Sequence, residues 1–356
     1  MIERGGANTM TSPSQAAIAG AETPDPGDVG LTTELAGQNG SKDQLVGRSP
    51  GQLMWMRFKR DRTGVISAFV VIAFFAIAAL APVISKLYGK DPYTRYGQTQ
   101  PGLLNDNAYP IKPNGGMDGD FWFGIEPKLG RDVFMQLIYG MRTSLSLAVV
   151  ITVLSVFTAI VIGVAGGYFG GKTDYFLGRF TDLMMSFPSQ LFFVAFTPVI
   201  GALMVDPQDE MPTWLRASVL IYVMWLLGWM TLARLLRGQV LSLREREFVE
   251  AAKVAGTPPW RIIRKELVPN VVTPILVQST YMLPNFVTSI AGLSFLGVGM
   301  LEPTPDWGRM FATGAEVYQS DITYMFFPGG AMLIFIVAFN LFGDSVRDAF
   351  DPKSGR

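Results

Sequence analysis

One stretch of this sequence, Gly166 to Thr173, has the residue types and spacing of a phosphate-binding loop. The pattern G-x-x-x-x-G-K-T holds phosphates with backbone amides and a lysine, provided that a strand delivers the loop to a helix N-terminus. Here the stretch follows a long apolar run, so we expect it at the C-terminal end of a membrane-spanning helix, which presents carbonyl groups. We therefore expect no nucleotide binding at this motif. Gly163, Gly167 and Gly171, spaced by four, instead predict a helix-packing stripe that runs into a turn.

Two chemically versatile residue types are missing, because the 356-residue sequence has no His and no Cys. This removes the usual metal sites, cysteine nucleophiles and any Ser-His-Asp arrangement, although an enzyme could still use carboxylates or lysine. No acid or base lies near the middle of a long apolar run, whereas an ion-coupled carrier or a proton relay needs one there. The sequence therefore predicts no catalytic residue and no metal site. It disfavours two alternatives, a stand-alone ion-coupled secondary transporter or channel and a membrane-anchored enzyme.

A second stretch is suited to contact with another protein. Its small, apolar residues recur at the helical spacing i, i+3, i+4 and i+7: Phe248, Ala251, Ala252 and Ala255. Gly256 and the Pro258-Pro259 pair end the predicted helix. Glu250 lies on its charged side, where it can pair with Arg246 or with a basic group of a partner. The alternative is a helix that lies on lipid headgroups.

Composition and hydropathy place the chain in a membrane, since 49% of its residues are hydrophobic, 16% are charged and the mean hydropathy is +0.30. A bilayer core requires about 20 apolar residues in a helix, and six charge-free runs are long enough. We expect an all-α membrane protein with six transmembrane helices, at about 64–84, 144–167, 183–205, 215–233, 267–292 and 322–343. The fifth run continues to 301, and Pro269, Pro274 and Pro284 predict kinks before the helix ends near Gly292. Buried helices of a soluble protein are the alternative, but 356 residues cannot surround six such helices.

Positive charge sets the expected orientation. Lys and Arg gather in the flanks 57–62, 172–179 and 234–265 and near the C-terminus, whereas the short loops on the other side are acidic. The positive-inside rule then places both termini and the loop 238–265 in the cytosol, and the loop 85–142 outside. Residues 1–50 lack aromatic side chains, so we expect a disordered cytoplasmic tail that is not a signal peptide. The membrane domain is expected to occupy residues 51–356.

The cytosolic stretch resembles a known signature. Glu250-Ala251-Ala252, Gly256 and Pro269 are similar to the pattern in permease subunits of bacterial ATP-driven (ABC) importers. In that family the segment is a coupling helix seated in a groove of the ATPase subunit. Two positions depart from the usual pattern, because Glu266 and Val268 stand where other residues are common.

Three further sets of residues resemble the C-type permease of the dipeptide and oligopeptide importer family, over about residues 55–352. The first precedes the second span: Gly124, Gly130, Arg131, Asp132, Gly140, Arg142, Ser144 and Leu145. The second precedes the last span: Ser294, Phe295, Leu296, Gly297, Gly299, Pro303, Pro305, Trp307 and Gly308. The third is near the C-terminus: Gly343, Asp344, Arg347, Asp348, Asp351 and Pro352. Ile125-Glu126, Met135-Gln136 and Glu302 depart from the family pattern, and the 87–120 segment is longer than typical.

The resemblance implies a type I ABC importer permease fold in the bacterial plasma (inner) membrane, working by alternating access. The implied partners are a paralogous second permease in a heterodimer, two ATPase subunits that bind ATP and Mg, an extracytoplasmic solute-binding protein and the lipid bilayer, with no nucleic acid. This chain would hold no cofactor and be a non-catalytic subunit. The implied cargo is dipeptides or oligopeptides, with nickel or glutathione as alternatives. The hydroxyl groups expected along the substrate path belong to Ser186, Ser189, Ser279 and Thr280.

Overall fold

The computed structural model describes residues 50–206, 208–209 and 211–350. The expected tail up to residue 49 and the motif residues Asp351 and Pro352 lie outside the described residues. Within these ranges the chain forms helices and no strand, apart from two isolated bridges. The elements are α1 (Pro50–Arg60), α2 (Arg62–Tyr88), α3 (Tyr96–Thr99), α4 (Pro113–Gly116), α5 (Val133–Phe169), α6 (Gly171–Met185), α7 (Ser189–Met204), α8 (Thr213–Gly228), α9 (Met230–Leu243), α10 (Glu247–Val254), α11 (Pro259–Ile262), a π-helical turn η1 (Ile263–Leu267), α12 (Val268–Asn270), α13 (Val272–Phe295), α14 (Trp307–Val317) and α15 (Thr323–Phe350). The expected all-α class is confirmed.

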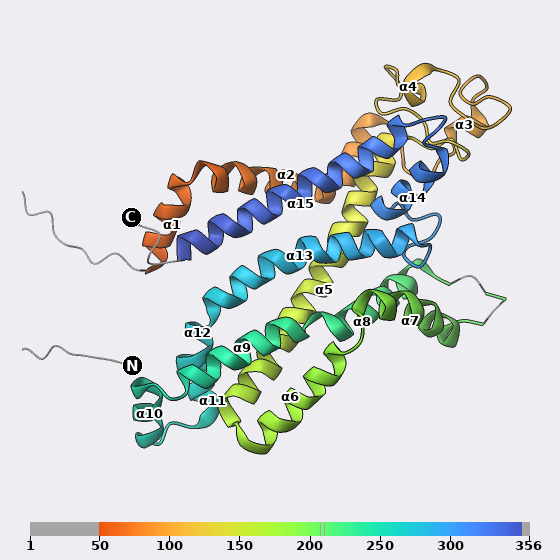
Figure 1. The fold of residues 1–356 in the computed structure, drawn as a ribbon. Helices are drawn as coiled ribbons and strands as arrows, with labels where there is room; N and C mark the ends of the chain where they lie inside the picture. Colours follow the sequence, from red (N-terminus) through yellow and green to blue (C-terminus); the bar gives the residue numbers. More distant parts are fainter. Residues whose placement is uncertain (1–49, 207, 210, 351–356) are drawn as a thin grey trace, which may run out of the picture. The chain divides into compact units, whose positions relative to one another are not determined.

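Helix α5 is the element on which the other long helices assemble. α9, α13 and α2 pack against it, and α15 lies against α2 and α13 (Figure 1). Their buried side chains form one large apolar cluster, with Ile151 of α5, Leu236 of α9 and Phe335 of α15 fully buried. α10 and α11 lie at one end of these helices, whereas α3, α4 and α14 lie at the opposite end (Figure 1). The predicted coupling segment and the predicted outer-face motifs are thus far apart.

Glycines allow α5 and α9 to approach closely. A Cβ at Gly163 would lie 2.6 Å from the Ala233 carbonyl oxygen, and one at Gly167 would lie 2.7 Å from the Val240 Cβ. Neither distance is possible for a real Cβ, so the two backbones can touch only because side chains are missing there. The packing stripe predicted at these two positions is confirmed. Gly171 differs, because a Cβ there would meet nothing within 4 Å.

Among the described residues, four helical stretches are long and apolar enough to cross a membrane: α2, α5, the stretch Thr213–Leu243 formed by α8 and α9, and α15. α6 and α7 together meet the same criterion, but they meet at an angle of 83°. The prediction of one continuous helix over 183–205 is therefore wrong. Pro188 explains the break, because proline offers no N–H and disfavours the helical conformation of Phe187 before it.

The expected fifth span also differs from the prediction. Three elements replace one helix over 267–292: the end of η1, α12 and α13, which continues to Phe295. α13 has 24 residues and is long enough to cross a membrane, but it is too polar to be among the apolar stretches named above. The predicted outer loop 85–142 is shorter than expected, because α2 extends to Tyr88 and α5 begins at Val133.

Candidate functional site

The predicted coupling helix forms as α10 and ends in a Schellman motif. The Thr257 N–H donates to the Ala252 carbonyl oxygen, and the Gly256 N–H donates to the Lys253 carbonyl oxygen, both at 3.0 Å. The motif requires a left-handed residue after the helix, and Gly256 supplies it with a φ of 72°. A Cβ at Gly256 would meet nothing within 4 Å. Backbone conformation, and not crowding within this chain, therefore accounts for the glycine.

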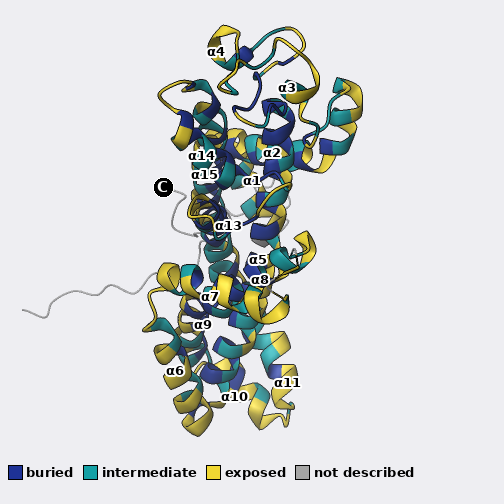
Figure 2. Ribbon diagram, turned by 90° about the vertical axis from the view of Figure 1, so that its right-hand side faces the viewer, coloured by how far each residue is buried: buried dark blue, intermediate teal, exposed yellow. Residues whose placement is uncertain are grey.

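α10 presents most of its surface to solvent (Figure 2). Val249 is fully buried and fixes the helix to the core, and Ala252 is half-buried against that core. The exposed apolar or small side chains at this end are Phe248, Ala251, Val254, Ala255 and Trp260. The sequence prediction omitted Val254, although its spacing of three from Ala251 was a usable signal. These side chains form an apolar surface that this chain leaves uncovered.

Glu250 is exposed on α10, and the described residues form no ion pair between Glu250 and Arg246. Arg244 instead pairs with Glu245 at 2.8 Å. Lys253 Nζ donates to the Arg244 carbonyl oxygen at 3.4 Å, and Arg244 Nη1 donates to the Gly167 carbonyl oxygen at 3.3 Å. The end of α10 is thereby fastened to the ends of α9 and α5, while the Glu250 carboxylate stays available to a partner.

Pro269 shapes the return of the chain toward α13. A proline in a helix removes one backbone hydrogen bond and clashes with the carbonyl four residues earlier. The chain accommodates it with η1, in which the Val268 N–H donates to the Ile263 carbonyl oxygen, five residues back. The Asn270 side-chain amide donates to the Glu266 carbonyl oxygen at 2.5 Å. Glu266, which departs from the family pattern, thus leaves this turn intact.

The structure divides the phosphate-loop-like motif between two helices. Gly166 belongs to the last turn of α5, whereas Lys172 and Thr173 lie in the first turn of α6, and no strand precedes them in the described residues. α6 does begin here, which the sequence analysis did not anticipate. Asp174 occupies its first turn and pairs with Arg237 of α9. A carboxylate in the first turn of a helix repels a phosphate at that N-terminus.

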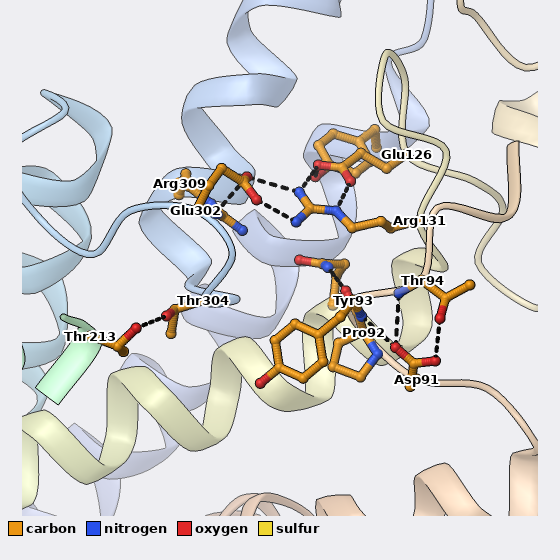
Figure 3. A network of polar contacts seen from close by, with 12 residues as sticks. Asp91, Pro92, Tyr93, Thr94, Glu126, Arg131, Thr213, Glu302, Thr304 and Arg309 are labelled. Atoms are coloured by element: carbon orange, nitrogen blue, oxygen red, sulfur yellow. Dashed lines mark hydrogen bonds and ion pairs between the residues drawn. The ribbon is translucent and has the colours of Figure 1, made fainter. Parts of the chain in front are cut away.

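At the opposite end, Arg131 is the centre of a buried ion network (Figure 3). Its guanidinium is 2% exposed, and it donates to both oxygens of Glu126, which is 3% exposed. It also donates to both oxygens of Glu302, at 2.6 and 3.0 Å. Arg309 Nη1 lies 2.6 Å from Glu302 without hydrogen-bond alignment, and the Tyr324 hydroxyl donates to Glu126 at 3.3 Å.

This network explains two departures from the family pattern together. Glu126 and Glu302 are unusual in the family resemblance, yet both carboxylates contact the same arginine. Burial alone would lower the pKa of the Arg131 guanidinium, but the two glutamates raise it, so Arg131 keeps its charge. A buried arginine needs such partners, because an unpaired buried charge is costly.

Two buried aspartates begin helices at this end. Asp132 accepts a hydrogen bond from the Met135 N–H at 2.8 Å, which caps α5. Asp306 caps α14 by accepting from the Arg309 N–H at 3.0 Å, and it accepts from the Ser144 hydroxyl at 3.1 Å. Burial raises the pKa of both carboxyls, and the hydrogen bonds offset part of that rise.

The remaining outer-face motif residues also make close contacts between helices. Trp307 is fully buried and its indole N–H donates to the Leu137 carbonyl oxygen at 3.0 Å, which joins α14 to α5. A Cβ at Gly308 would lie 2.3 Å from the Ala291 carbonyl oxygen of α13. Gly130 has a φ of 72°, and a Cβ there would lie 2.6 Å from a neighbouring backbone. These motif positions hold helices together and present no reactive group.

The four hydroxyl residues proposed for a substrate path lie in two places, at the break between α6 and α7 and on α13. Ser186 and Ser189 are exposed on either side of the break between α6 and α7. The Ser279 hydroxyl donates to the Ile275 carbonyl oxygen at 2.6 Å, and the Thr280 hydroxyl donates to the Val277 carbonyl oxygen at 2.7 Å. Both half-buried residues are thus satisfied within α13. Their role in a path stays a prediction.

Comparison with known proteins supports the resemblance. Residues 159–356 match the family of binding-protein-dependent transport system inner membrane components, and residues 49–110 match the N-terminal TM domain of oligopeptide transport permease C. The dipeptide transport system permease protein DppC of Alkalihalophilus pseudofirmus is 30% identical over 312 residues, covering 88% of this chain and 93% of the relative. The oligopeptide transport system permease protein OppC of Bacillus subtilis is 32% identical over 298 residues, covering 84% and 88%.

A solved structure with inward-facing conformations of the MetNI methionine ABC transporter has a TM-score of 0.48 and 18% identity, and the match covers 61% of this chain and 96% of that chain. The family matches and the two permease relatives span the apolar helices, α10 and the outer-face motifs. The chain belongs to the family of binding-protein-dependent transport system inner membrane components, and it is a permease subunit of that family.

Proposed function

We propose that this permease subunit serves an importer of dipeptides or oligopeptides, with energy supplied by two separate ATPase subunits. The observation that carries the proposal is the exposed surface of α10, at one end of the long helices. There an eight-residue helix, fixed by buried Val249 and ended by Gly256, leaves an apolar surface and the Glu250 carboxylate uncovered. Such a surface is suited to docking in a groove of another protein, because exposed apolar patches mark interaction sites. The printed names of relatives in dipeptide and oligopeptide transport support the cargo.

The other partners of the complex follow from the proposal that this chain is an importer permease. A paralogous permease completes the path, and an extracytoplasmic solute-binding protein delivers peptide at the end that carries the Arg131 network. α10 and both termini face the cytosol, as the distribution of Lys and Arg indicates. ATP and Mg are bound by the ATPase subunits.

The test is reconstitution of the complex with its cognate permease, ATPase subunits and binding protein in liposomes. We expect uptake of a labelled dipeptide or tripeptide that requires ATP and all subunits. The chain alone should show no uptake driven by a proton or sodium gradient. Gradient-driven uptake by the chain alone, or peptide uptake by a complex that lacks the ATPase subunits, would contradict the proposal.

The phosphate-loop-like motif provides a second expectation. Lys172→Ala will leave ATP hydrolysis by the complete complex nearly unchanged, because the lysine lies in a helical turn beside Asp174 and reaches no nucleotide. The measurement is the ATPase rate of purified wild-type and variant complexes. If the purified single chain binds ATP and Lys172→Ala abolishes that binding, the expectation that this motif binds no nucleotide is wrong.

A further inference from the structure

α13 has an uncharged polar side on a helix that is long enough to cross a membrane. Its 24 residues extend about 36 Å at the usual rise, against a bilayer core of about 30 Å. Gln278, Asn285 and Ser289 are spaced by seven and four, so they lie on one face. Leu283, Phe286, Val287 and Ile290, on the other side, are buried in the core. The helix therefore turns its polar side away from the apolar core.

This polar side is accessible in the single chain. Asn285 is exposed, and Gln278 and Ser289 are half-buried. Asn285 lies ten residues before the end of α13 at Phe295, which puts it about 15 Å from that end. At that depth a carboxamide facing acyl chains would lack hydrogen-bond partners, at a cost of about 4 kcal/mol or more. Contact with lipid is therefore the least favourable environment for this face.

A second helix brings another amide to the same face. Gln190 of α7 is exposed, and its Nε2 donates to the Ser289 hydroxyl oxygen at 3.0 Å. Gln190 lies in the first turn of α7, directly after the break at Pro188. The break thus positions the start of α7 beside Ser289, in the C-terminal half of α13. Ser279 and Thr280 lie on the opposite, packed side, where Thr280 faces Gly343 of α15.

We propose that Gln190, Gln278, Asn285 and Ser289, here called the amide stripe, line a water-filled path and hydrogen-bond the backbone of a passing peptide. The inference rests on the proposed function and names residues for its substrate path. A side-chain carboxamide both donates and accepts, as a peptide N–H and C=O require. The stripe has no charge, so it selects no particular peptide side chain. Weak, repeated contacts of this kind allow a solute to enter and also to leave.

The absence of cysteine from the sequence makes the test direct. Asn285→Cys and Ser289→Cys each place one thiol on the stripe. Ile72→Cys on α2 and Leu333→Cys on α15 are matched controls, because these side chains are 65% and 64% exposed on apolar helices. Complete complexes in membrane vesicles are treated with a charged methanethiosulfonate. Because the thiolate reacts and forms only in water, we expect the stripe thiols to react at least about tenfold faster than the controls, and a transported peptide to slow them.

Each outcome decides the inference. Thiols at 285 and 289 that react no faster than the one at 333 would overturn it, whether lipid or the second permease covers the stripe. Fast reaction that peptide does not slow would overturn the contact with peptide. ATP-driven peptide uptake is measured separately in complexes that contain the unsubstituted chain. Normal ATP-driven uptake together with unreactive thiols would contradict the role of the amide stripe and leave the proposed function intact. Reactive thiols without ATP-driven uptake would contradict the proposed function, although the stripe would still line a water-filled path.

Discussion

Gly256→Val will uncouple ATP hydrolysis from transport while the chain still inserts into the membrane and pairs with its partner permease. Gly256 closes the Schellman motif of α10 at a φ of 72°, where a residue with a Cβ is destabilised by roughly 1–2 kcal/mol and a β-branched residue by more. The last turn of α10 must then unwind, which displaces the exposed surface around Ala251 and Ala255. We expect transport and the retention of ATPase subunits on the purified complex to fall together, by about tenfold or more.

Two matched variants separate backbone conformation from other effects at this end. Gly256→Asn should keep most of the transport, because asparagine tolerates the left-handed region. Gly238→Val is the control for the substitution itself, since Gly238 lies in α9 and a Cβ there meets nothing within 4 Å. Glu250→Ala should act in the same direction as Gly256→Val but more weakly, because an exposed carboxylate contributes little. Full transport and a full complement of ATPase subunits in Gly256→Val would refute the assignment of α10 to coupling.

Arg131→Met will destabilise the part of the molecule where α3, α4 and α14 lie, at the end of the long helices opposite α10. The substitution leaves Glu126 buried without its countercharge, and breaking a buried ion pair in this way costs about 3–5 kcal/mol. It also releases Glu302, which is 48% exposed and can regain water. We expect a lower Tm for the purified chain and faster proteolysis between Tyr88 and Val133.

Lys128→Met is the control for this substitution. Lys128 pairs with Glu316 of α14 at 2.6 Å, but both side chains are more than half exposed, so its loss should leave the Tm nearly unchanged. The double variant Arg131→Met with Glu126→Gln should recover part of the lost stability, because the buried negative charge is gone. An unchanged Tm in Arg131→Met would mean that the network does not stabilise this end.

Local signals in the sequence were sufficient for α10. The apolar spacing from Phe248 to Ala255 and the breakers that follow predicted a helix within one residue of Glu247–Val254, because both signals act between neighbouring residues. The partners of Arg131 were not predictable in this way. Glu302 is 171 positions away, and periodicity carries no information about contacts at that separation. The one signal in the sequence was that Glu126 and Glu302 both depart from the family pattern, which is consistent with a common partner.

The polar side of α13 was accessible to sequence reasoning but was missed. Ser279 and Thr280 were chosen by residue type, although their spacing from Leu283 and Val287 places them on the packed face. Helical phase would have selected Asn285 and Ser289 instead. The break at Pro188 was also readable, because proline disfavours a helical residue before it. The 83° angle between α6 and α7 could not be predicted from the sequence, since it depends on what the two helices pack against.

The close approach of α5 and α9 has a mechanical consequence. Where Gly163 and Gly167 meet α9, α5 contributes no side chain, and the Ala233 carbonyl oxygen and the Val240 side chain lie directly against the α5 backbone. The two helices therefore cannot slide past one another without a clash. If α10 docks on an ATPase subunit as proposed, a displacement of α10 toward the end of α9 will therefore move α5 with it. α5 has 37 residues and extends about 55 Å. One of its ends lies near α10 and the other lies beside Arg131, so a rigid motion of α5 reaches both. A small rotation at one end then becomes a larger sideways displacement at the other.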